Sequence, residues 1–238
     1  MKKFFPLLLS ACCLSVLSAP VRSNVGASGC VRSSSDKGGV PVLRITPITT
    51  SIHYSPFDTE EIFSSSEDFK VVAKMRIVPN STIGSWGTML GTTGSNNNNG
   101  INVRQNSRAD GFRIYFSGIN TYVTDDYGID ANEWVEVEIS FDGIYFNGIC
   151  DINSRYLSPE SYTSTGKLYI GEGPRGYGAT CATDWQYVQI WRNGILTREY
   201  VPHISGCFYD TVTGTMLLCN RLSTTRVQYL EEESTYAK

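Results

Sequence analysis

Polar and apolar residues alternate strictly in residues 133–152, EWVEVEISFDGIYFNGICDI. The apolar positions are Val135, Val137, Ile139 and Phe141, and the positions between them are Trp134, Glu136, Glu138, Ser140 and Asp142. Successive side chains of a β-strand point to opposite faces, so this pattern predicts a strand with one dry and one wet face. The same period of two recurs in residues 68–78, DFKVVAKMRIV, where the apolar side chains again share one face.

Turn signals separate further short β-patterned segments. Five Asx-Gly pairs lie between these segments: Asn99-Gly100, Asp110-Gly111, Asp142-Gly143, Asn147-Gly148 and Asn193-Gly194. Such pairs favour tight hairpins, because both central residues of a type I′ turn need positive φ. Long helical patterns are missing, so the chain is predicted to be an all-β protein, a sandwich or a barrel.

The composition fits one exported domain. The chain has 238 residues and a net charge of −3, and it carries no basic stripe of the kind that binds nucleic acid. We expect a signal peptide in residues 1–27, a Ser/Gly-rich linker in 28–40, the folded domain in 41–221 and a polar tail in 222–238. An alternative is the lipobox-like LSAC at residues 9–12, which would leave Cys12 lipidated. The mature chain is therefore predicted to be secreted or attached to a bacterial envelope, without a membrane span.

Several of these segments resemble laminin G-like domains of the concanavalin A-like lectin/glucanase superfamily. The resemblance rests on EWVEVEISFDGIYFNGI (133–149), KLYIGEG (167–173), DWQYVQIWRNGILTREYVPH (184–203) and GCFYDTVTGTMLLC (206–219). The last segment is similar to the closing segment of bacterial and phage-associated members. The resemblance covers roughly residues 52–220 and implies a jelly-roll β-sandwich of two antiparallel sheets. It does not imply one function, since the fold hosts lectins, adhesion modules, glycosidases and structural parts.

The acidic row of residues 133–152 is an incomplete glycosidase motif. Glycosidases of the superfamily carry E-x-D-x-x-E on one strand, and the matching frame here begins Glu136-Val137-Glu138 but ends in Phe141. Asp142 follows one residue later, in a turn that already explains it. We therefore interpret Glu136 and Glu138 as the solvated face of a strand and predict no catalytic residue. No G-x-S-x-G, Walker loop or H-E-x-x-H motif is present.

A second alternating segment, DWQYVQIWR, provides the candidate binding residues. If Val188 and Ile190 enter the core, one face carries Trp185, Tyr187, Gln189 and Trp191. Exposed aromatic rows stack on the apolar faces of sugars, and neighbouring polar groups bind the hydroxyls. The competing interpretation is that a loop or the N-terminal segment covers these rings.

The sequence offers two further candidate sites, one at the rim of the sandwich and one at the closing hairpin. Asp125, Asp126 and Asp130 could offer oxygen ligands to calcium, although they are also ordinary turn residues, and no other cofactor is expected. A hairpin centred on Thr213, with the loop Val212-Thr213-Gly214, would place Cys207 opposite Cys219, which predicts a disulfide there. Pairing of Cys30, Cys150 and Cys181 stays open, and a zinc site is unexpected, since there is no C-x-x-C motif.

The sequence thus predicts a binding module, for a glycan or a cell-surface protein. The alternatives are a structural or interaction module without a small ligand and, less in keeping with the motifs, a glycoside hydrolase of the same fold.

Overall fold

The computed structural model describes residues 39–47, 55–64, 66–78, 88–92, 100–105, 112–116, 119–123, 132–153, 162, 167–172, 182–220 and 226–233. Within these ranges the residues form β-strands, turns and irregular segments, apart from Arg226, which has 3₁₀ geometry. None of the described segments forms a helix long and apolar enough to cross a membrane. The predicted signal peptide, the alternative lipobox with Cys12, and nearly all of the predicted linker lie outside the described residues.

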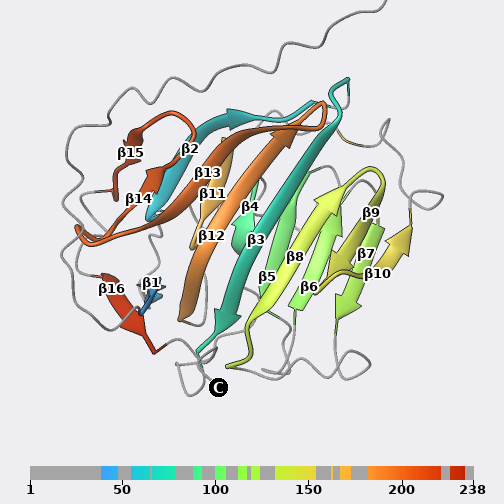
Figure 1. Ribbon diagram of the computed structural model, residues 1–238. Coiled ribbons are helices and arrows are strands. Elements are labelled where there is room, and N and C mark those ends of the chain that lie inside the picture. The colour runs from blue at the N-terminus through green and yellow to red at the C-terminus, as the bar shows by residue number, and fades with distance from the viewer. Residues whose placement is uncertain are drawn as a thin grey trace, which may run out of the picture. The chain divides into compact units, whose positions relative to one another are not determined.

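The strands form two antiparallel sheets (Figure 1). The larger sheet contains β1 (Val40–Ile45), β3 (Phe69–Ile77), β8 (Val135–Ser140), β9 (Gly143–Phe146), β10 (Ile149–Asn153), β12 (Thr183–Arg192), β13 (Ile195–His203), β14 (Cys207–Asp210), β15 (Thr215–Leu217) and β16 (Val227–Glu232). The smaller sheet contains β2 (Phe57–Ile62), β4 (Thr88–Gly91), β5 (Asn102–Gln105), β6 (Phe112–Phe116), β7 (Ile119–Val123) and β11 (Lys167–Ile170). The prediction of an all-β sandwich with two antiparallel sheets is confirmed.

The chain crosses repeatedly between the sheets, so strands adjacent in space come from distant parts of the sequence. The larger sheet runs β10-β9-β8-β3-β12-β13-β14-β15, with β1 joined to β12 and β16 joined to β1. The smaller sheet runs β2-β11-β4-β5-β6-β7. In the larger sheet, β3 lies between β8 and β12, which places three long segments with exposed polar faces side by side.

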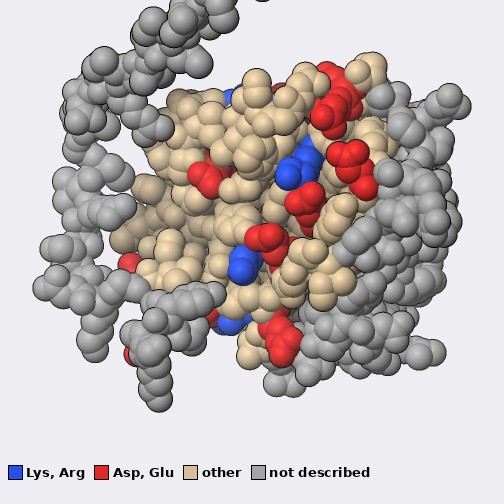
Figure 2. All heavy atoms as spheres, turned by 45° about the vertical axis from the view of Figure 1, so that its right-hand side comes forward, with Lys and Arg blue, Asp and Glu red and all other residues tan. Residues whose placement is uncertain are grey.

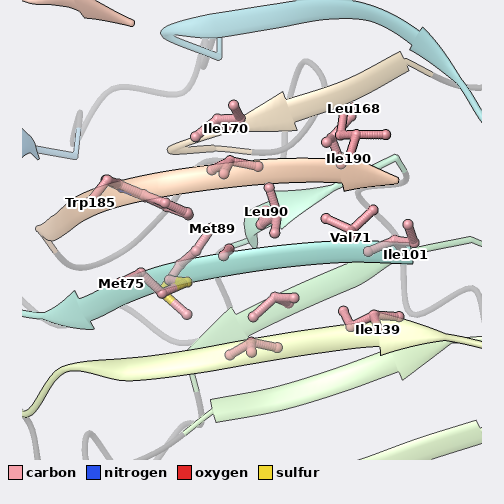
Figure 3. Close-up of a cluster of buried hydrophobic side chains, with 14 of the residues drawn as sticks. Val71, Met75, Met89, Leu90, Ile101, Ile139, Leu168, Ile170, Trp185 and Ile190 are labelled. Carbon is pink, nitrogen blue, oxygen red and sulfur yellow. The ribbon is translucent and has the colours of Figure 1, made fainter. Parts of the chain in front are cut away.

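The core lies between the two sheets (Figure 3). Val71, Met75, Ile139, Trp185 and Ile190 enter it from the larger sheet, and Met89, Leu90, Ile101, Leu168 and Ile170 enter it from the smaller one. The apolar positions that alternate along β3 and β8 are buried as predicted, and Glu136 and Glu138 lie on the other face. Burial of this apolar surface is the main favourable term in the folding of the sandwich.

A β-bulge in β12 reverses the predicted orientation of Trp185. Trp185 pairs with Met75 of β3 and Tyr187 pairs with Lys74, which leaves Gln186 as an extra residue in β12. A bulge interrupts the alternation of side chains. Trp185 therefore shares the core face with Val188 and is fully buried. The prediction that Trp185 belongs to an outer aromatic row is wrong.

The closing hairpin has a different register from the predicted one. Asp210 pairs with Thr215, which leaves a loop of four residues, Thr211–Gly214, in place of the predicted three. The side chain of Asp210 stabilises this loop, because its Oδ1 accepts a hydrogen bond from the Val212 amide at 3.0 Å. Gly214 has φ +74° and donates its amide to the Asp210 carbonyl at 2.8 Å.

The change of register removes the basis of the predicted disulfide. Extending the observed pairing brings Leu218, rather than Cys219, opposite Cys207. Both thiols are free in the structure, and burial raises the pKa of the Cys219 thiol to about 11. The predicted Cys207–Cys219 bridge is therefore absent from this structure. Cys30, Cys181 and the side chain of Cys150 lie outside what the structure describes.

The sandwich extends beyond the predicted boundary at residue 221. β16 lies in the segment interpreted as a polar tail, and it pairs with β1 from Val40–Glu232 to Ile45–Val227 (Figure 1). Leu230 and Tyr229 give this short segment partly buried side chains. The folded unit therefore includes the C-terminal strand.

Candidate functional site

The outer face of the larger sheet carries the predicted binding residues in cross-strand rows. The rows are Glu136–Lys74–Tyr187, Glu138–Val72–Gln189 and Ser140–Lys70–Trp191, each running from β8 through β3 to β12. Side chains that face each other across an antiparallel pair lie close enough to interact. Acidic and basic side chains consequently form a band across the described surface (Figure 2).

At one end of these rows, Trp191 borders a shallow hollow of about 230 Å³. The hollow is lined by Asp68, Phe69, Lys70, Glu138, Ser140, Asp142, Trp191 and Gly194. The Lys70 ammonium lies 5.0 Å from the centroid of the Trp191 ring and 3.6 Å from a carboxylate oxygen of Glu138. Trp191 is half-buried, so part of its ring remains available to a ligand at this position.

At the other end, Tyr187 and Trp134 border a second hollow of about 430 Å³. Its lining comprises Val40, Lys74, Arg76, Trp134, Gln186, Tyr187, Glu232 and Glu233. The guanidinium of Arg76 lies 4.7 Å from the centroid of the Trp134 ring, and the indole Nε1 donates a hydrogen bond to Glu232 at 3.3 Å. A ring fixed in this way loses little conformational entropy when it binds a ligand.

Gln189 lies between the two hollows, and both polar atoms of its side-chain amide form hydrogen bonds within the protein. Its Nε2 donates to Glu199 at 2.9 Å, and its Oε1 accepts a hydrogen bond from Trp191 Nε1 at 3.3 Å. This arrangement orients the Trp191 ring and links β12 to β13. It also places hydrogen-bonding groups between the aromatic side chains.

A buried carboxylate supports the Tyr187 end of the face. Asp184 is fully buried on β12 and accepts hydrogen bonds from Arg44 at 2.7 and 2.8 Å and from Arg76 at 2.8 and 2.7 Å. The hydrogen bond with Asp184 is the largest cause of a raised pKa for Arg44. Arg76 also pairs with Glu232, so β1, β3, β12 and β16 are tied together here.

The two glutamates of the incomplete glycosidase motif have separate partners. The Tyr187 hydroxyl donates a hydrogen bond to Glu136, and burial together with this bond raises the pKa of Tyr187. The phenol therefore stays protonated and continues to donate at physiological pH. Glu138 pairs only loosely with Lys70, and both of these side chains are about one-third exposed, at 30% and 36%.

The structure thus keeps three of the four predicted binding residues on one face. Tyr187, Gln189 and Trp191 lie on the outer face, whereas Trp185 lies in the core. Sequence reasoning did not select Trp134, although it alternates in phase with Glu136 and so was expected on the polar face. Asp125, Asp126 and Asp130, the predicted calcium ligands, lie outside the described residues. Within the described ranges, no group of three or more His, Cys, Asp or Glu side chains is arranged to hold a metal ion.

Comparisons with known proteins do not supply a family for this chain. No family model matches it, and a search of curated proteins finds no match. The functional argument therefore depends on the chemistry of the outer face.

Proposed function

We propose that this chain is a binding module, secreted or attached to the cell envelope, whose outer sheet face binds an extended oligosaccharide. The proposal includes a relationship to the laminin G-like domains that the sequence resembles. It assigns the protein no catalytic role. The observation that carries it is the pair of aromatic-lined hollows on one face, with hydrogen-bonding side chains between them.

The chemistry of this face suits a carbohydrate. Aromatic rings with a polar atom at one edge combine apolar contact with hydrogen bonding, and the face presents Trp134, Tyr187 and Trp191 in this form. Tyr187 and Trp191 are four residues apart on β12, which corresponds to about 13 Å along a strand. A ligand that contacts both rings must therefore be extended.

Binding to a glycan array, followed by titration of the best oligosaccharide, tests the proposal. We expect Trp191→Ala to weaken binding by about tenfold, because one stacked ring contributes on the order of 1 kcal/mol or more. Leu218→Ala is the matched control, since Leu218 is 69% exposed and lies away from both hollows. If no oligosaccharide binds, or if Trp191→Ala binds it unchanged while remaining folded, the proposal is wrong and the structural alternative gains support.

We also expect Glu136 and Glu138 to have no catalytic role. Replacing both by glutamine should leave the protein folded, since both side chains are partly exposed. The measurement is reducing-sugar release from β-glucan and galactan by the wild type and the double variant. Cleavage by the wild type that disappears in the variant would instead identify a glycoside hydrolase.

A further inference from the structure

The hollow beside Trp191 carries an excess of negative charge. Its lining includes the carboxylates of Asp68, Glu138 and Asp142 and the single ammonium of Lys70. Lys70 pairs with Glu138, and within the described part of the chain neither Asp68 nor Asp142 forms an ion pair. Three carboxylates against one ammonium leave the hollow with two uncompensated negative charges.

The backbone holds these acidic side chains at one end of the sheet. Asp68 directly precedes β3, and Asp142 lies in the turn between β8 and β9. The Ser140 hydroxyl accepts a hydrogen bond from the Asp142 amide at 3.2 Å, which stabilises this turn. The Asn193-Gly194 turn between β12 and β13 also borders the hollow, through Gly194. The backbone amide of Asn193 donates a hydrogen bond to the Asp68 carbonyl at 2.8 Å. The backbone at Asp68 and Asp142 is therefore held in place, and both exposed side chains extend from it at the hollow.

The hollow already contains one ammonium group, that of the Lys70 side chain. The Lys70 nitrogen contacts the Trp191 ring and Glu138, the two kinds of group that stabilise an organic cation in a protein. A second cation would find Asp68 and Asp142 unpaired at the exposed rim, where opposite charge raises both the association rate and the affinity.

We infer that this hollow selects oligosaccharides that carry protonated amino groups. The inference rests on the proposed function and names its ligand class: an amino sugar whose ring contacts Trp191 and whose ammonium lies among the carboxylates. A sugar chain is favoured over a lysine-rich peptide because a second aromatic hollow follows about 13 Å along β12, which suits a stiff, extended ligand.

The test compares two trisaccharides that differ only in the amino group. We expect the β-1,4-linked glucosamine trimer to bind about tenfold more tightly than its N-acetylated counterpart, measured by calorimetry at about pH 6, where free amino groups are protonated. Raising the salt concentration from about 0.05 to about 0.5 M should reduce this preference, because salt screens exposed charges.

The double variant Asp68→Asn/Asp142→Asn locates the effect. Asparagine has nearly the same size and shape as aspartate, so each replacement removes the charge and keeps a short polar side chain at the turn. We expect the variant to lose about tenfold in affinity for the glucosamine trimer and to bind the acetylated trimer unchanged. Asp58→Asn is the control, because Asp58 is an exposed acid on β2 of the other sheet and should change neither affinity.

The outcomes separate this inference from the proposed function. Equal affinity for the two trimers, or an equal loss of both in the double variant, overturns the amino-sugar inference while glycan binding stands. Absence of binding to either trimer and to every array glycan overturns both. A lysine pentapeptide that competes as strongly as the glucosamine trimer would show that the hollow recognises basic peptides instead.

Discussion

Replacing Trp185 by alanine is expected to lower the free energy of unfolding by about 3–5 kcal/mol. The ring is fully buried in the core between the two sheets, at a position that pairs with Met75 of β3. Its removal leaves a cavity and also a Thr183 hydroxyl that has lost the indole donor at 2.8 Å. The measurement is denaturant-induced unfolding followed by circular dichroism.

Trp191→Ala is the matched control on the same strand. Trp191 is only half-buried, so the loss of its contact with Lys70 should cost no more than about 1 kcal/mol. Equal destabilisation by the two replacements would contradict the bulge at Gln186, since that bulge is what separates the environments of the two rings.

Replacing Asp184 by asparagine is expected to lower the free energy of unfolding by about 3 kcal/mol. The change leaves Arg76, which is 12% exposed, and Arg44, which is 31% exposed, without their shared carboxylate. Solvent at Arg44 limits the penalty, which is why we expect the lower end of the range for a broken buried ion pair. Thermal and denaturant unfolding measure the effect.

The control for this replacement is Asp58→Asn. Asp58 is 46% exposed and its carboxylate lies 3.7 Å from the Lys167 ammonium, so solvent screens this surface pair and its loss should leave the stability nearly unchanged. Asp184→Asn should also loosen β16, because Arg76 would hold Glu232 without itself being anchored by the Asp184 carboxylate. Hydrogen exchange at Leu230 that stays as slow as in the wild type would contradict this account of the network.

Much of the sandwich was predictable because its strands follow simple alternation. The apolar positions of β3 and β8 enter the core as expected, and the Asn147-Gly148 and Asn193-Gly194 turns both adopt positive φ at both residues. The prediction for Asp142-Gly143 is wrong, because Gly143 pairs with Ser140 and neither residue of that pair has positive φ. These features depend on residues close in sequence, where side-chain period and turn chemistry decide the outcome.

The errors arose where distant strands determine the local structure. The bulge in β12 depends on how that strand pairs with β3 and is not visible in the alternation of residues 184–192. The polar sequence of β16 predicts a tail, because the strand becomes ordered only through pairing with β1, nearly two hundred residues earlier in the chain. The closing hairpin differs by one residue because the Asp210 side chain stabilises a four-residue loop.

The candidate site was only partly predictable for the same reason. Tyr187, Gln189 and Trp191 share a strand, so alternation alone placed them together. Trp134 comes from the start of β8 and joins Tyr187 only through the order β8-β3-β12. The ion pairs around Asp184 likewise bring together four strands that no local pattern connects.

The most direct measurement is NMR titration of the indole ¹⁵N–¹H signals with the oligosaccharide that binds best. The chain has four tryptophans, and their signals can be assigned with single Trp→Phe variants. We expect the signals of Trp191 and Trp134 to shift together on binding and the signal of Trp185 to stay unchanged. A ligand that leaves Trp191 and Trp134 unshifted, or that shifts Trp185 alone, would contradict binding at the outer face of the larger sheet.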